Sequence, residues 1–143
     1  MSSPDPAFRV FISHSSVDTW VALQIARAVE ACGAAYFLDE ADMEYGDDFE
    51  DKILAAVRAS QELLVLLTPW AIKRPYIWLE MGAVWGQGQR IVGVLYGLGV
   101  KELMTDEGTP ALLKRITLVE INKLDEYFDQ LAARVEKARQ DNG

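Results

Sequence analysis

The sequence predicts an α/β fold in which a parallel sheet is covered by helices on both faces. Short apolar runs alternate along the chain with segments of helical periodicity, as parallel βαβ units require. Residues 63–67 are apolar without alternation, which is typical of a strand buried on both faces. The alternation yields five strands, the number found in flavodoxin-like sheets with strand order 2-1-3-4-5. We therefore expect a flavodoxin-like three-layer sandwich.

The first half of the chain supplies two strands and two helices. Residues 8–12 form a β-rich run, and residues 35–38 form the next. The intervening segment, about 17–31, has apolar residues at helical spacing, namely Val21, Ile25, Ala28 and Val29. Ser15 and Asp18 fit a capping box that would start this helix near Ser16, and Gly33 would end it. Apolar spacing over residues 49–57 predicts the second helix.

The second half continues the alternation. The strand at residues 63–67 is stopped by Thr68 and a proline, and Pro75 suits the first turn of a helix that ends near residue 86 or 88. Strands are expected at 91–95 and 116–121, with a short helix around Leu103 between them. Residues 124–139 predict a closing amphipathic helix whose inner stripe consists of Tyr127, Phe128, Leu131 and Val135.

Composition bounds the organisation of the chain. Its 143 residues suit one domain over residues 8–139, with a disordered N-terminus at 1–7 and a tail at 140–143. Cys32 is the only cysteine, and the sequence shows neither a secretory signal nor a membrane-length apolar run, so we expect a cytoplasmic protein that is not in the membrane. One histidine, one cysteine and no EF-hand, P-loop or G-x-G-x-x-G pattern argue against a bound metal or cofactor.

The net charge of −8 equals the charge of one segment. Residues 39–51 contain eight acidic and no basic side chains. Such a surface repels a phosphate backbone, so we expect no direct binding of nucleic acid. The segment is either a solvated acidic loop or a docking surface for a basic patch on a partner or on another copy of the chain.

The predicted topology locates a ligand site before the ligand is known. In this fold, ligands bind beyond the carboxyl ends of strands one and three, where the strand order reverses. The loop Ser13–Ser16, the segment after Asp39 and residues 68–80 converge there. Backbone amides and hydroxyls of Ser13 and Ser15 suit phosphate oxygens, although capping explains Ser15 equally well. For His14 we expect a surface or partly buried position without catalytic duty.

Glu80 is a lone carboxylate in an otherwise apolar helix, residues 77–86 (IWLEMGAVWG). At about 100° per residue it lies roughly 40° from Val84, at the edge of the apolar arc. Leu79 and Ala83 occupy the opposite side, which we expect to be covered as well. A desolvated carboxylate needs compensation. Either a substrate provides it, or a fixed partner does, such as Lys73, Arg74 or a backbone amide.

Four motifs in order resemble a Toll/interleukin-1 receptor (TIR) domain of the bacterial type. They are residues 11–18 (FISHSSVD), residues 37–39 (FLD) with Gly46 and residues 49–51 downstream, residues 66–69 (LLTP), and Tyr76 four residues before Glu80. The resemblance runs from about residue 8 to residue 138. The family fold is flavodoxin-like, in agreement with the pattern of strands and helices.

The resemblance implies an NAD⁺ glycohydrolase that releases nicotinamide with ADP-ribose or a cyclic isomer. Glu80 matches the family's catalytic glutamate, and Tyr76 takes the place of an aromatic that is usually tryptophan. Tyr76 and Trp70 would offer flat walls for a ring, and Asp39 would help to place the substrate or the acidic loop. Glu44 matches an acidic position often present in the loop of catalytically active relatives. One carboxylate suffices because nicotinamide leaves as a neutral molecule, so no general acid is needed.

The resemblance also implies self-association through the loop at residues 41–47, and a role in antiviral defence or signalling together with a sensor or effector. NAD⁺ would be the substrate, with no further cofactor. Three alternatives stay open or are weakened. A TIR scaffold without activity needs no such glutamate. A nucleoside deoxyribosyltransferase-like enzyme is a minor option. A phosphoacceptor receiver would need acids where Ser13, His14 and Thr68 stand.

Overall fold

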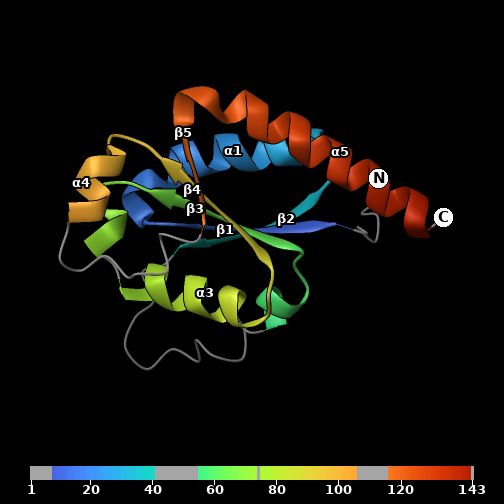
Figure 1. The fold of residues 1–143 in the computed structure, drawn as a ribbon, viewed down its shortest axis with the longest axis horizontal. Coiled ribbons are helices and arrows are strands. Elements are labelled where there is room, and N and C mark those ends of the chain that lie inside the picture. Colours follow the sequence, from blue (N-terminus) through green and yellow to red (C-terminus); the bar gives the residue numbers. More distant parts are fainter. Residues whose placement is uncertain (1–7, 41–54, 74, 106–115, 143) are drawn as a thin grey trace.

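The computed structural model describes residues 8–40, 55–73, 75–105 and 116–142 (Figure 1). It contains a five-stranded sheet of order β2-β1-β3-β4-β5 in which every pair of neighbouring strands is parallel. The strands are β1 (Arg9–His14), β2 (Ala35–Glu40), β3 (Glu62–Leu67), β4 (Arg90–Leu95) and β5 (Thr117–Glu120). The predicted flavodoxin-like topology is confirmed.

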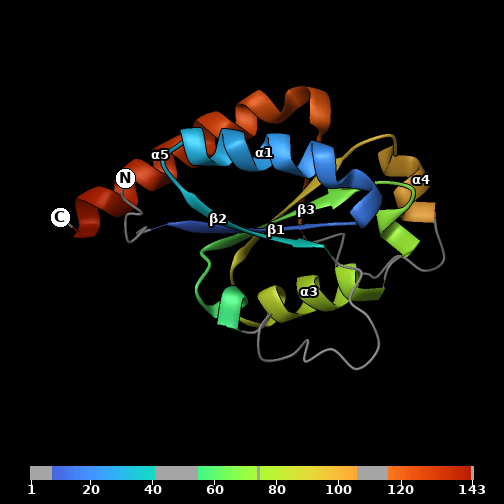
Figure 2. The same cartoon turned by 180° about the vertical axis from the view of Figure 1, so that it is seen from behind.

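Helices cover both faces of the sheet. Figures 1 and 2 show α1 (Thr19–Ala31) and α5 (Leu124–Asn142) on one face and α3 (Pro75–Gly86) on the other. The short α4 (Val100–Thr105) lies at the end of the molecule where α1 begins. Residues 55–58 are helical, at the end of the second predicted helix, and the remainder of that helix lies outside the described residues. The predicted start of α3 at Pro75 and the helix around Leu103 are confirmed.

Two apolar layers form the core, one on each face of the sheet. Neighbouring residues of β3 point to opposite faces, so Leu63, Val65 and Leu67 join the layer beneath α3, whereas Leu64 and Leu66 join the layer beneath α1 and α5. All five are 0% exposed. This is why the run at residues 63–67 carries no polar alternation.

The start of the first helix differs from its prediction. A 3-10 turn, η1 (Ser16–Asp18), precedes α1, and neither Ser15 nor Asp18 makes a side-chain capping bond. The predicted capping box is therefore wrong, because Asp18 is engaged elsewhere in the fold, as described below. At the other end of α1, Gly33 has φ +93°, a left-handed conformation that suits glycine and ends the helix as predicted.

Two smaller differences concern the last elements. Strand β5 ends at Glu120, and Ile121 instead begins a 3-10 turn, η4 (Ile121–Lys123). Helix α5 continues to Asn142, so residues 140–142 are helical rather than a tail. Its inner stripe is buried at Tyr127, Leu131 and Val135. Within the described residues, no helix is both long and apolar enough to cross a bilayer.

Candidate functional site

Polar side chains gather where the strand order reverses. Strand β1 lies between β2 and β3, and its Ser13 is in register with Asp39 of β2 and with Val65 of β3. Ser13, His14 and Ser15 are each 0% exposed, and Asp39 is 9% exposed. The fold thus brings four predicted site residues to one place, at the carboxyl edge of the sheet. The expectation of a surface or partly buried His14 is wrong, since the end of β1 is covered on both faces.

Asp18 and Thr68 link the two loops at this edge. The Thr68 hydroxyl donates to Oδ2 of Asp18 at 2.7 Å and accepts a hydrogen bond from the Ala71 backbone amide at 3.0 Å. Asp18 is 5% exposed and Thr68 is 0% exposed. The chain of hydrogen bonds therefore fixes the turn after β1 against the turn after β3, inside the protein, where hydrogen bonds to a charged group are strong.

Two buried oxygens beside this link have no hydrogen-bond partner among the described residues. They are Oγ of Ser15 and Oδ2 of Asp39. Most buried polar groups in proteins are hydrogen-bonded, so such atoms mark positions that water, a ligand or a movement of the chain completes. The nearby His14 ring is held through Nε2, which lies 3.3 Å from the Thr19 hydroxyl.

The segment after β3 carries the remaining predicted residues. Trp70 is 57% exposed and lies just before the 3-10 turn η2 (Ala71–Lys73). Tyr76 and Glu80 both lie on α3, but their side chains, like Glu44 and the loop at 41–47, lie outside the described residues. The direction of the Glu80 carboxylate therefore stays a prediction.

Helix α3 is anchored by one buried face. Ile77, Met81 and Val84 are at most 1% exposed and pack into the core layer between the sheet and α3. Glu80 precedes Met81 directly and lies one turn before Val84, so its Cα is at the edge of the buried face. The expected covering of the opposite side concerns Leu79 and Ala83, whose side chains lie outside the described residues, so it stays a prediction.

Sequence reasoning missed the role of Asp18 and Thr68. Asp18 suggested a cap and Thr68 a strand end, because each was interpreted from its local neighbours. The only available signal was topological. Both residues follow strands that the predicted order places side by side, so a carboxylate and a hydroxyl at those two ends could have been paired.

The comparisons with known proteins agree with this geometry. The profile of the TIR domain family matches residues 10–135. The chain belongs to the TIR domain family. No curated protein matches the sequence.

Solved structures with the same fold include TIR domains and a glycosidase. The TIR domain of the Toll-related receptor TRR-2 from Hydra magnipapillata is 20% identical with a TM-score of 0.61, over 91% of this chain and 97% of that one. The CMP N-glycosidase BcmB of Clostridium botulinum is 15% identical with a TM-score of 0.57, over 86% and 97%. The RPS4–RRS1 TIR domain heterodimer is 16% identical with a TM-score of 0.60, over 90% and 96%.

Proposed function

We propose that this TIR domain is an NAD⁺ glycohydrolase of the bacterial type, with Glu80 as its catalytic carboxylate. The observation that carries the proposal is the position of Glu80. Helix α3 begins after the turn that follows β3, and Glu80 lies about 8 Å along the helix from its first residue. A glutamate near the start of the helix that follows β3 matches the family's catalytic glutamate, and this match supports the proposal.

The reaction suits the groups that gather at this edge. The bond between the ribose C1′ and the nicotinamide nitrogen breaks, and the electron pair leaves with nicotinamide, which becomes neutral. The ribose then carries a positive charge that a carboxylate stabilises electrostatically. Water adds to C1′ and loses a proton to give ADP-ribose, whereas attack by an adenine nitrogen gives a cyclic isomer. The BcmB glycosidase, whose name records cleavage of an N-glycosidic bond, shows that this fold supports related chemistry.

Buried polar groups at the carboxyl edge of the sheet support binding of a ribose and its phosphates. Asp39 and Ser15 each have an oxygen without a hydrogen-bond partner among the described residues, and both lie at the reversal of the strand order. Trp70, which is more than half exposed, is available for stacking against a ring. We propose that Ser13, His14 and Ser15 form the floor of the site, and the family resemblance adds Tyr76 and Glu44 as further contacts to the substrate.

A scaffold that binds other TIR domains is the second candidate, and the distribution of exposed apolar residues favours it. Six of the large exposed side chains follow the carboxyl ends of β1, β3 and β4: Val17, Trp20, Trp70, Tyr96, Val100 and Met104. Apolar groups concentrated at one edge indicate a protein interface. The two candidates are compatible, because an assembly of TIR domains can also complete an active site. We infer such self-association, as in the heterodimer of the comparison, with a role in defence or signalling.

Product analysis tests the proposal. Purified protein at high concentration, incubated with NAD⁺, is expected to release nicotinamide that chromatography detects, and the companion product distinguishes linear from cyclic chemistry. Glu80→Ala is expected to abolish release while circular dichroism and the melting temperature stay close to wild type. Release that persists in this variant would remove the proposed mechanism. Absence of release from wild type under oligomerising conditions would favour the scaffold.

A further inference from the structure

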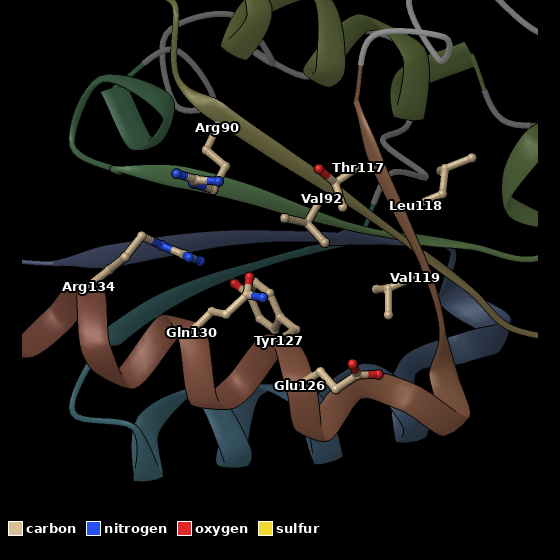
Figure 3. A pocket seen from close by; sticks show the side chains of 9 residues that line it. All are labelled: Arg90, Val92, Thr117, Leu118, Val119, Glu126, Tyr127, Gln130 and Arg134. Atoms are coloured by element: carbon tan, nitrogen blue, oxygen red, sulfur yellow. The ribbon is translucent and has the colours of Figure 1, made fainter.

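A hollow of about 190 Å³ lies along β4 and β5, between these strands and α5. Arg90 and Thr117 are the first residues of β4 and β5, and they line this hollow together with Gln130 and Arg134 of α5. Figure 3 shows these side chains around one space, with both guanidinium groups at the same end. Its arginine end lies where the parallel strands β4 and β5 begin, and none of its lining residues belongs to the proposed active site, so the two sites are separate.

The end that contains the two arginines carries an excess of positive charge. Behind it lies Glu62, which is 1% exposed and accepts hydrogen bonds from Nε and Nη2 of Arg134, each at 3.0 Å. The Tyr127 hydroxyl donates to the same carboxylate at 2.7 Å. Nε of Arg90 is 4.0 Å from Glu62. Among the described residues, two guanidinium groups therefore face one carboxylate at this end, which leaves an excess of one positive charge.

A second acidic residue, Glu126, does not cancel this charge locally. Glu126 also lines the hollow, but Figure 3 shows it at the other end, beside Val119. The apolar wall of the hollow is formed by Val92 and Val119. The hollow thus has a cationic end, an apolar middle and a separate acidic residue beyond.

One of the two arginines at the cationic end, Arg134, is held in place before any ligand arrives. Arg134 is fixed through two hydrogen bonds to Glu62, and its guanidinium carbon lies 5.8 Å from the centre of the Tyr127 ring. A planar group that is already oriented loses little entropy when it binds an anion. Arg90, whose side chain is 53% exposed, can turn toward a ligand without breaking a close ion pair.

We propose that this hollow binds a small organic carboxylate, whose charged group contacts Arg90 and Arg134 and whose apolar body lies against Val92 and Val119. Thr117 and Gln130 supply neutral hydrogen-bonding groups at the rim. The volume of 190 Å³ lies below the roughly 300 Å³ at which pockets for drug-sized ligands begin, so a nucleotide is excluded. The proposal does not depend on the proposed function.

Titration of the whole chain with matched probes, followed by NMR, tests this proposal. Benzoate and hexanoate are the carboxylates, and benzamide is the neutral analogue of benzoate with the same shape. We expect at least one carboxylate to bind about tenfold more tightly than benzamide, because charge-assisted hydrogen bonds are roughly twice as strong as neutral ones. The shifted amide signals should include Thr117 and Gln130. The chain's net charge of −8 opposes non-specific attraction of an anion.

Substitution of Arg90 separates the hollow from the rest of the surface. Arg90→Gln is expected to weaken carboxylate binding about tenfold and to leave benzamide binding unchanged. The control, Arg27→Gln, changes an exposed arginine of α1 outside the hollow and is expected to leave carboxylate binding unchanged. Arg134 is left intact because its loss would remove two hydrogen bonds from the buried Glu62 carboxylate. Failure of both carboxylates to bind, binding of neither carboxylate more tightly than benzamide, or unchanged carboxylate binding by Arg90→Gln would each overturn the proposal.

Discussion

Asp18 shows how a single side chain can be misjudged from its local sequence. Its neighbours predict a helix cap, yet its carboxylate is buried and accepts a hydrogen bond from Thr68, fifty residues further along the chain. A contact over that distance leaves no periodic trace in the sequence. By contrast, Gly33 and Pro75 act through their own backbone geometry, and both were predicted correctly.

Substitution of Thr68 tests this link at the level of one hydroxyl. Thr68→Val keeps the shape of the side chain but removes the donor to Asp18 and the acceptor for the Ala71 amide. We expect the free energy of unfolding to fall by about 1–3 kcal/mol, since a buried carboxylate loses its partner. Thr68→Ser retains the hydroxyl and should lose clearly less. Urea denaturation measures both, and equal losses in the two variants would contradict the account.

At the scale of elements, Glu62, which is the first residue of β3, connects this strand to α5 through its hydrogen bonds. The strand was predicted to start at residue 63, and the buried acid before it went unnoticed because its partners, Tyr127 and Arg134, lie 65 and 72 residues away. The apolar run of β3 and the stripe of α5 were predictable, because periodicity records which face is buried. Which polar groups meet across two elements is decided by register, and periodicity contains no information about it.

The Tyr127–Glu62 hydrogen bond predicts a dependence of stability on alkaline pH. Burial raises the pKa of Tyr127 far above its ordinary value, and the neighbouring Glu62 carboxylate raises it further. Because the pKa is higher in the folded state, this contribution to stability is fully present below the unfolded pKa of about 10 and is lost as the pH rises above it.

Comparison of Tyr127→Phe with wild type measures this contribution. At pH 8 the variant should be less stable by about 1–3 kcal/mol, because Glu62 loses a donor. Between pH 10 and 11 (about one unit above the unfolded pKa) the difference should narrow, since only the wild type has Tyr127 to ionise on unfolding. Denaturant titrations across this range give the result. A difference that is constant with pH would show that Tyr127 titrates normally.

For the whole molecule, the concentration of apolar side chains at the carboxyl edge predicts activity that depends on assembly. Trp20 is 72% exposed and lines a hollow of about 490 Å³ together with Tyr96 and Phe128. We expect NAD⁺ turnover per molecule to rise with protein concentration, and Trp20→Ser to lower both turnover and the oligomeric fraction in sedimentation velocity.

Trp85→Ser provides the matched control for this prediction. Trp85 is 41% exposed but lies near the end of α3, away from the carboxyl edge. The Trp85→Ser substitution should leave the oligomeric fraction and NAD⁺ turnover close to wild type. Turnover that is independent of concentration, or equal effects of the two tryptophan substitutions, would contradict an interface at the carboxyl edge.

The measurement that tests the central claim most directly is the rate of nicotinamide release by Glu80→Gln relative to wild type, with Glu30→Gln as a control. Glutamine keeps the size of the side chain and removes only its charge, while Glu30 is an exposed acid near the end of α1. We predict that release falls by about a hundredfold or more in Glu80→Gln, as loss of one electrostatic stabiliser does in other enzymes, and is unchanged in Glu30→Gln. Equal rates in Glu80→Gln and wild type would show that Glu80 is not the catalytic group.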